Sequence, residues 1–519
     1  MGSQVEGEKV RPGGPYAWYV LTILVIVYVL NFIDRQILSI LAEDVKRDLG
    51  LSDADLGFLF GTAFGVFYAL FGIPLGRLAD SWHRVRLMTI GLALWSAMTA
   101  LSGLCRTGWQ LSLARIGVGV GEATASPCAY SILSDYFPRE QRATALAVYS
   151  SGIYIGGGLS LFIGGAIVQG WNAAYPGGGP LGLVGWQAAF MAVGLPGVLL
   201  ALWVATLKEP VRGLSDGMPT PVSPSPFRDF AGELVTIIPP FTLIGAARRG
   251  AAALALNLLA GALATGFALG MIGLTGSVPQ WSAVALGGYA VFSWASALRS
   301  RDLPTFRLIW GTPAFLYVAL GYGLIAFTSY AISLWAAPYA ERVLGEPKAT
   351  VGFVLGGGAA LGGFLGVVLG GRLADHWRRR NPAGRIPVIL IGIVGPVLPI
   401  ILAYTTGSAP LFYALSFMIQ LLASSALGAA AATTQDLVLP RMRGTATATF
   451  FIATTLVGLA FGPWFTGYVS GLSGSLRTGI LALLGVAPVS VLLLLLAYRA
   501  LPAAEASVAE RARLAGEAG

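Results

Sequence analysis

Long apolar stretches separated by short polar segments run along most of the chain. Most of them reach about 20 residues, the length at which a helix crosses the roughly 30 Å hydrocarbon core of a membrane. The pattern therefore predicts membrane-spanning helices throughout the chain. Fourteen spans are predicted, near residues 17–41, 55–78, 85–104, 109–134, 141–169, 184–207, 250–274, 281–298, 311–340, 350–373, 386–404, 410–435, 444–470 and 478–499.

The composition fits a membrane protein and excludes a soluble one. Of the 519 residues, 55% are hydrophobic and only 11% are charged, whereas about 25% of the residues in a soluble globular chain are charged. The mean hydropathy is +0.73. The first apolar run is too long for a cleavable signal peptide and has no small-residue cleavage site. We therefore expect it to be retained as the first span.

Basic residues collect in alternate loops, which predicts the orientation of the chain. The net charge is +9, and cytoplasmic loops of membrane proteins are rich in Lys and Arg. Loops 83–86, 139–142 and 378–385 each hold at least two arginines, whereas loop 170–183 holds no basic residue and loop 42–54 is an exception with two. We expect a multi-pass protein of the cell (inner) membrane with both termini in the cytoplasm. Its partners would be the lipid bilayer and a small substrate, not nucleic acid.

Cysteine and histidine are scarce. The chain has Cys105, Cys128, His83 and His376, a set that forms neither a disulfide framework nor a zinc motif. No nucleophile stands with a base in a recognisable arrangement. We therefore expect no metal, no cofactor and no enzyme activity, with protons as the coupling ion of a transporter. We also expect a monomer.

An internal repeat links the two halves of the chain. Residues 76–84 (GRLADSWHR) recur at 371–379 (GRLADHWRR), an offset of 295. An Asp and an Arg seven residues apart, Asp135 and Arg142, recur 301 residues later. Two ordered matches in nearly one register indicate two homologous six-helix halves in the same orientation. Halves of this kind are typical of the major facilitator fold, where an axis along the membrane normal relates them.

These features predict an all-α polytopic membrane protein with the major facilitator fold, in which two six-helix bundles and an extra hairpin give 12+2 transmembrane helices. Residues 1–210 would form the N-terminal bundle and 211–305 a cytoplasmic linker with the hairpin. Residues 306–500 would form the C-terminal bundle and 501–519 a cytoplasmic tail. The run at 250–274 has no charge, which favours a spanning hairpin over two helices lying at the membrane surface.

The repeated loops contain residues suited to a cytoplasmic gate. Gly76 and Gly371 permit close helix packing. Asp80 and Asp375 can accept hydrogen bonds from a helix N-terminus or pair with an arginine. Two copies at matching positions favour a latch that locks one conformation over an ordinary solvated turn. The predicted gate consists of Gly76, Asp80, Arg84, Asp135, Arg142, Gly371, Asp375, Arg379, Asp436 and Arg443.

Four charged residues interrupt the apolar spans. Asp34 and Arg35 lie in the first span, and Arg115 and Glu122 lie in the fourth. A charge near the middle of a bilayer costs at least about 2.5–3.5 kcal/mol, so such residues usually face a cavity and have a function. At about 1.5 Å per residue, Asp34 and Arg115 lie toward the same outer side and Glu122 lies close to the midplane. We predict that all four take part in proton coupling or substrate binding.

Depth decides which carboxyl group is expected to carry the proton. Asp34 lies at the depth of Arg35 and Arg115, so we expect it to pair with a cation and stay ionised. Glu122 has no cation at the same depth on its own helix, and burial favours a protonated carboxyl group. Glu122 is therefore the first candidate proton carrier and Asp34 the second. The alternative is an ion-pair network that only fixes helix packing.

The second half has no matching charges. Its predicted spans near 311–340 and 410–435 contain only neutral residues. A charged wall opposite an apolar wall suits a small amphipathic substrate. The predicted substrate-cavity residues are Asn31, Thr328, Ser329, Tyr330 and Trp335.

Three segments resemble those of one transporter family. Asn31-Phe32-Ile33-Asp34-Arg35 resembles the Asn-x-x-Asp-Arg segment of spinster-type transporters, which belong to the major facilitator superfamily. Residues 115–123 resemble their fourth-span motif, and 334–338 are similar to a segment of their seventh core helix. The resemblance covers most of both halves but not the region 241–300. It implies secondary active transport by alternating access of a lysophospholipid or sphingoid phosphate, with proton coupling and headgroup binding at the four charged residues.

Two other functions stay open. A multidrug or organic-ion exporter would have the same fold and a different cargo. A non-transporting membrane sensor or scaffold is an alternative of another class. The paired gate loops argue against that class, and so does the lack of an appended soluble domain.

Overall fold

The computed structural model describes residues 12–213, 215 and 223–517. The first eleven residues of the predicted N-terminal bundle lie outside the described residues. So do most of the polar linker at 214–222 and the last two residues of the predicted tail.

The described chain is helical, and its first half contains the six predicted spans. Spans 2 and 4 are each divided: a five-residue π-helical segment follows a short first helix in span 2, and span 4 breaks at Ala123 and Thr124. The elements are α1 (Pro15–Leu49), α2 (Asp53–Gly57), η1 (Phe58–Thr62), α3 (Ala63–Ser81), α4 (Arg84–Ser102), α5 (Gly108–Glu122), α6 (Ala125–Tyr136), α7 (Arg139–Ala174) and α8 (Gly185–Val204).

The second half also has a broken fourth span and a π-helical segment, but the π-helical segment lies in a different span. Its fourth span breaks at Ser425, and its fifth span contains the π-helical segment η5 (Thr454–Leu459). The elements are α14 (Pro313–Arg342), α15 (Lys348–Arg378), α16 (Ile386–Val394), α17 (Val397–Thr405), α18 (Ala409–Ser424), α19 (Ala426–Asp436), α20 (Arg443–Ala453), α21 (Gly462–Ser473), α22 (Leu476–Ala482), the 3-10 segment η6 (Leu483–Val486), α23 (Ala487–Ala506) and α24 (Val508–Leu514).

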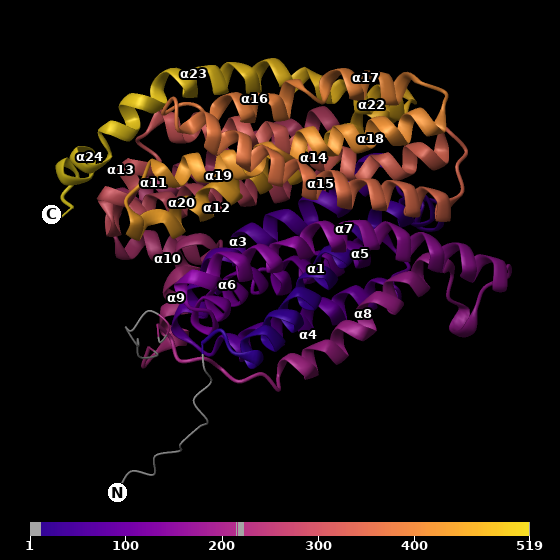
Figure 1. Cartoon of the computed structure of the whole chain (residues 1–519), viewed down its shortest axis with the longest axis horizontal. Coiled ribbons are helices and arrows are strands. Elements are labelled where there is room, and N and C mark those ends of the chain that lie inside the picture. The colour runs from indigo at the N-terminus through magenta and orange to yellow at the C-terminus, as the bar shows by residue number, and fades with distance from the viewer. Residues whose placement is uncertain (1–11, 214, 216–222, 518–519) are drawn as a thin grey trace, which may run out of the picture.

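The segment between the halves is helical too. It contains α9 (Pro226–Ile237), α10 (Phe241–Arg248), the hairpin helices α11 (Ala251–Thr275) and α12 (Val278–Arg301), and α13 (Leu303–Ile309). Helices α9 and α10 meet at 97°. Figure 1 shows the two halves as two layers lying against each other, with α9, α10, α13 and α24 gathered at one end.

Twelve helices among the described residues are long and apolar enough to cross a membrane, or thirteen if the bent pair α9–α10 counts as one span. They include α11 of the predicted hairpin. The broken span at 109–134 and the helix at 281–298 are present as helices but fall below that criterion. The predicted all-α membrane fold is confirmed, and the exact number of fourteen spans stays a prediction.

The predicted tail differs from the structure. Helix α23 continues through Leu501 to Ala506, and α24 packs against α13. Arg511 donates to the Thr312 hydroxyl, and Ala512 is buried. Residues 501–517 therefore belong to the second half and do not hang free. The sequence suggested a tail because its composition is polar and rich in Ala.

The two ends of the molecule are distinct. We call the end where α1 begins and α23 ends the near end, and the end where α1 stops at Leu49 the far end. Ion pairs that join the two halves in the described part of the chain lie at the far end. Arg342 Nη2 is 2.6 Å from Glu43 Oε1, Arg342 Nη1 is 2.8 Å from Asp53 Oδ2, and Lys348 Nζ is 3.1 Å from Asp44 Oδ2. The far end is therefore closed.

Glycines let the helices of the two halves touch along α7 and α15. A Cβ on Gly158 would lie 2.5 Å from the carbonyl oxygen of Gly356, a distance that real Cβ atoms do not reach. The adjacent Gly157 has nothing within 4 Å of its Cβ position.

We expect Gly158→Ala to force α7 and α15 apart and to slow any transport that requires far-end closure. Gly157→Ala is the matched control, because it adds the same methyl group in open space and only gains about 1 kcal/mol of helix propensity. Side-by-side flux measurements on the two variants check this. Equal flux in both would contradict it.

Candidate functional site

Arg35 and Glu122 form a buried ion pair inside the first half. Arg35 donates to Glu122 Oε2 from Nη2 at 2.8 Å and from Nε at 3.1 Å. The Glu122 side chain is fully buried and that of Arg35 is 11% exposed. The guanidinium also lies 4.6–4.9 Å from the ring centroids of Phe32, Phe64 and Tyr68. Aromatic faces attract a cation, so Arg35 is held on several sides.

Asp34 is the carboxyl group that no ion pair holds. It is fully buried, and neither carboxyl oxygen has a hydrogen-bond partner in the part of the chain that the structure describes. Thr99 and Trp95 lie beside it without meeting the geometry of a hydrogen bond. Arg115 Nη1 donates to the backbone oxygen of Asp34 at 3.1 Å. Asp34, Arg35, Arg115 and Glu122 are called the charged cluster below.

The local sequence explains why α5 packs so closely against α3 and α4. A Cβ on Gly119 would lie 2.6 Å from the carbonyl oxygen of Phe64, and one on Gly121 would lie 2.8 Å from the backbone nitrogen of Trp95. The alternating glycines thus allow α5 to touch α3 and α4. The helix then ends at Glu122, directly before the break.

The structure brings the four predicted charges together but pairs them differently. The depth argument paired Asp34 with a cation and left Glu122 without one. Arg35 instead reaches Glu122, because the two side chains extend toward each other from neighbouring helices. Side-chain reach exceeds the depth differences on which that argument relied.

Arg115 keeps two hydrogen-bond donors without partners. Its Nε and Nη2 make no hydrogen bond to any described residue, although the whole side chain is buried. A guanidinium can bind a phosphate or carboxylate through two parallel hydrogen bonds. Arg115 is therefore the group of the charged cluster best placed to bind an anionic ligand.

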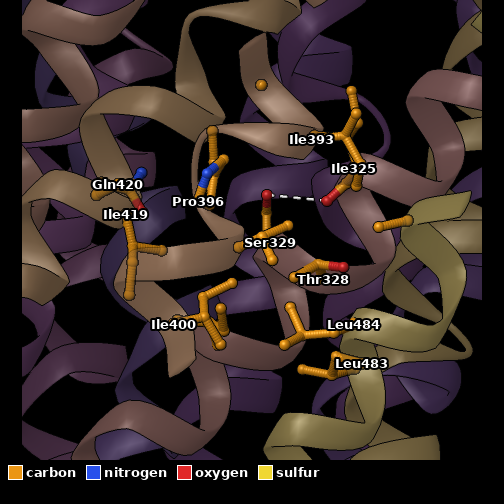
Figure 2. A pocket seen from close by; sticks show the side chains of 15 residues that line it. Ile325, Thr328, Ser329, Ile393, Pro396, Ile400, Ile419, Gln420, Leu483 and Leu484 are labelled. Carbon is orange, nitrogen blue, oxygen red and sulfur yellow. Dashed lines mark hydrogen bonds between the residues drawn. The ribbon is translucent and has the colours of Figure 1, made fainter. Parts of the chain in front are cut away.

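A pocket lies inside the second half, between α14, α16, α17, α18 and the start of α23. Its cavity volume is about 20 Å³, which is room for about one water molecule. Thr328 and Ser329 line it, and Figure 2 shows the Ser329 hydroxyl turned toward the backbone oxygen of Ile325, to which it donates at 3.0 Å. Gln420 adds an amide at one side. The rest of the lining is mainly apolar, with Ile332, Ile393, Pro396, Ile400, Ile419, Leu483 and Leu484.

The predicted cavity residues fall into three groups. Thr328 and Ser329 line the pocket, whereas Asn31 lies beside Glu122 and Tyr330 near Arg35. Trp335 does not line this pocket: it is fully buried, and its Nε1 donates to the backbone oxygen of Pro463 at 2.9 Å. Helix α14 turns that face toward α21, so Trp335 packs between helices in this conformation, and its place in the substrate cavity stays a prediction.

Sequence reasoning missed the rest of the pocket. Gln420 could have been found as an amide inside an apolar run. The isoleucines and leucines carry no signal that separates them from ordinary packing residues.

The gate of the first half is centred on Arg84. Arg84 is fully buried; its Nη1 pairs with Asp135, and its Nε donates to Glu209 Oε1 at 2.7 Å. Its Nη2 also donates to the backbone oxygen of Pro210 at 2.7 Å. Glu209 was missed, since it lies at the end of the sixth span, outside the repeated motif. All these partners belong to the same half or to its end.

The second gate uses a different arginine from the predicted one. Arg385 Nη1 is 2.5 Å from Asp436 Oδ2, and the separation of 51 residues equals that between Arg84 and Asp135. Arg379, its counterpart in the sequence alignment, is exposed. Arg385 lies ten residues after Asp375, whereas Arg84 lies four residues after Asp80, so six extra residues shift the register inside this loop. The alignment of Arg84 with Arg379 is therefore corrected.

The other gate residues are placed less tightly. Asp80 and Asp375 are exposed, and Asp375 is 3.7 Å from Arg385. Arg443 is exposed, and Arg142 is half-buried in the first turn of α7. Gly76 and Gly371 have nothing within 4 Å of their Cβ positions. The expectation that these two glycines allow close helix packing is wrong for this conformation.

The described residues contain no group of three or more His, Cys, Asp or Glu that could hold a metal ion.

Comparisons with known proteins agree with this architecture. The family profile of the Major Facilitator Superfamily matches residues 24–383 and 318–516. An MFS-type efflux pump of Mycolicibacterium smegmatis is 27% identical over 463 residues, covering 89% of this chain and 86% of the relative. Protein spinster homolog 1 of Xenopus tropicalis is 25% identical over 478 residues, covering 88% and 74%.

A crystal structure has a similar fold. It is that of a bacterial homolog of the human lysosomal transporter Spinster in an inward-facing, unoccupied conformation. The TM-score is 0.67 at 25% identity, with 97% of this chain and 99% of that chain covered.

Proposed function

Because the chain belongs to the major facilitator superfamily and is similar to its spinster-type members, we propose that it is a proton-coupled secondary transporter of an amphipathic anion. The cargo class is a lysophospholipid or a sphingoid phosphate. The two halves would expose one central site alternately to the two sides of the membrane.

The observation on which this proposal rests is the charged cluster. Asp34, Arg115 and Glu122 are buried among helices that cross the membrane. Such charges are costly and usually serve transport. The two hydrogen-bond donors of Arg115 that have no partner among the described residues could bind a phosphate. The side chain of Arg35 is slightly exposed.

The pocket of the second half supports the amphipathic part of the proposal. Its lining has no charged residue and offers only a few polar groups. In the proposed cycle the anionic headgroup binds at the charged cluster, and the pocket, which now has room for about one water molecule, widens to take the alkyl chain.

Proton coupling is assigned to Asp34 and Glu122. Arg35 holds Glu122 by two hydrogen bonds, whereas Asp34 has no such partner among the described residues. We propose that Asp34 binds and releases the proton, and that Glu122 responds when cargo competes for Arg35. This order reverses the one suggested by depth along the helices.

The basic loops place the near end in the cytoplasm of a cell (inner) membrane by the rule for Lys and Arg. Closure of the far end would then make this conformation inward-facing. We propose that the monomer is the working unit, since one chain supplies both halves.

A second candidate is export of drugs or other organic ions, which the similarity to an efflux pump favours. Reconstituted transporter should take up or release a labelled lysophospholipid or sphingoid phosphate. It should move a lipophilic cationic drug poorly, because Arg115, to which the headgroup is assigned, would repel a cation. Rapid drug flux with no lipid flux would overturn the cargo proposal and support the exporter.

A further inference from the structure

Gln280, near the start of α12, forms a buried polar contact with both halves at once. Its side chain is 1% exposed. The Thr62 hydroxyl, at the end of η1 in the first half, lies 2.5 Å from Gln280 Oε1 and 2.6 Å from the backbone oxygen of Ala460 in the second half. Gln280 Nε2 donates to that same oxygen at 3.1 Å. One amide thus joins hairpin, first half and second half.

Helix α12 packs against both halves along its length. Near its start, Trp281 packs edge-to-face on Phe461 and Trp464 of the second half. Farther along, Ala290 and Trp294 share a buried cluster with Val66 and Leu70 of α3 in the first half and with Ile452 and Ala460 of the second half.

Between these two regions, α12 lies in the groove where the halves meet. A Cβ on Gly287 would be 3.2 Å from Leu456 of the second half and 3.3 Å from Val66 of the first. A helix packed against both halves along its length opposes their separation.

We propose that α12 is a strap that holds the far end closed, and that Gln280 is its positioning residue. Opening of the far end separates η1 from η5, so the contact of Thr62 with Ala460 must break. Gln280 would then lose one of its two partners. In a site without water, a polar group that loses its hydrogen-bond partner costs free energy. The conformation that keeps the hydrogen bond is therefore favoured. The strap thus biases the protein toward the far-end-closed conformation.

The inference assumes the alternating transport proposed above, but its test needs no cargo. Spin labels at Leu104 and Leu472, both exposed on opposite halves near the far end, report the opening in the purified full chain. Cys105 and Cys128 are replaced by alanine in every sample. The protein is studied in lipid nanodiscs, without added ligand.

Gln280→Leu keeps the side-chain size and removes both hydrogen bonds. We expect the far-end-open population to rise about fivefold to tenfold, which corresponds to one or two hydrogen bonds between membrane helices. Thr62→Val removes the same contact from the side of the first half and should act in the same direction.

The matched control is Asn257→Leu. Asn257 is also a buried amide of the hairpin, but its Nδ2 donates to the backbone oxygen of Ala253 in its own helix, at 2.9 Å. It should leave the distance distribution unchanged.

Unchanged distributions in both Gln280→Leu and Thr62→Val would overturn the strap. So would an equal shift in Asn257→Leu, because the effect would then be a general weakening of the hairpin. If Gln280→Leu does not fold, Thr62→Val alone decides. The two proposals can fail separately. If the distance distributions shift as expected but neither lipid nor drug flux is found, the proposed transport is wrong and the strap is upheld.

Discussion

Replacing Asp34 with asparagine is expected to abolish accumulation of cargo by a pH gradient, while the protein still folds. With one proton per cycle, a gradient of one pH unit supplies about 1.4 kcal/mol, or about tenfold accumulation. Without a titratable group at position 34, the ratio should fall to about one. Asparagine retains the size of Asp34, whose carboxyl group has no hydrogen-bond partner to lose among the described residues. Uptake into proteoliposomes with and without the gradient measures the ratio.

Glu122→Gln is the comparison for that experiment. Arg35 then faces an amide in place of a carboxylate, so cargo affinity should change and the pH-driven transport should also weaken. If Asp34→Asn keeps full accumulation and Glu122→Gln loses it, the proton binds Glu122 instead. The assignment made from the ion-pair geometry would then be wrong, and the one made from helix depth would be right.

Arg84→Ala is expected to cost the most stability among single changes at the near end. Arg84 is fully buried and neutralises Asp135 and Glu209, of which Asp135 is only 8% exposed. Removing one partner of a buried ion pair typically costs about 3–5 kcal/mol, because the remaining charge stays buried without compensation. We expect about 3 kcal/mol here, since Glu209 is 23% exposed. Thermal unfolding in detergent should show a strongly lowered melting temperature.

Arg385→Ala tests the equivalent ion pair of the second half, which is more exposed to solvent. Its partner Asp436 is 33% exposed, so solvent screens the charge that is left behind, and a loss of about 1 kcal/mol or less is expected. A melting temperature lowered equally by the two substitutions would contradict this reading of burial. Equality would mean that the near-end arginines matter only for packing.

Much of the fold could be predicted from the pattern of apolar residues. The duplicated loops identified the two halves, and the uncharged run at 250–274 identified the first hairpin helix. The pattern of apolar residues did not show that the span around Glu122 breaks, because hydropathy does not register a single proline. Pro127, which has no backbone N–H to donate to the carbonyl of Ala123, is the sequence signal that was missed.

The candidate site could be predicted by residue type but not by pairing. Charges in apolar spans identified the charged cluster, yet the partner of Arg35 depends on side-chain reach across two helices. Trp335 shows the same limit, since α14 is apolar on all sides and its sequence does not reveal which face meets the cavity. Arg385 was missed because the shift in register lies in a loop, where no periodic pattern exists to reveal it.

Direct recording of proton movement in proteoliposomes tests the central claim most directly. A pH-sensitive dye trapped inside reports protons while a labelled lysophospholipid or sphingoid phosphate crosses the membrane. The account predicts that cargo moving down its gradient shifts the internal pH in the wild-type protein and leaves it unchanged in Asp34→Asn. Cargo flux in the wild-type protein with no proton movement would contradict it.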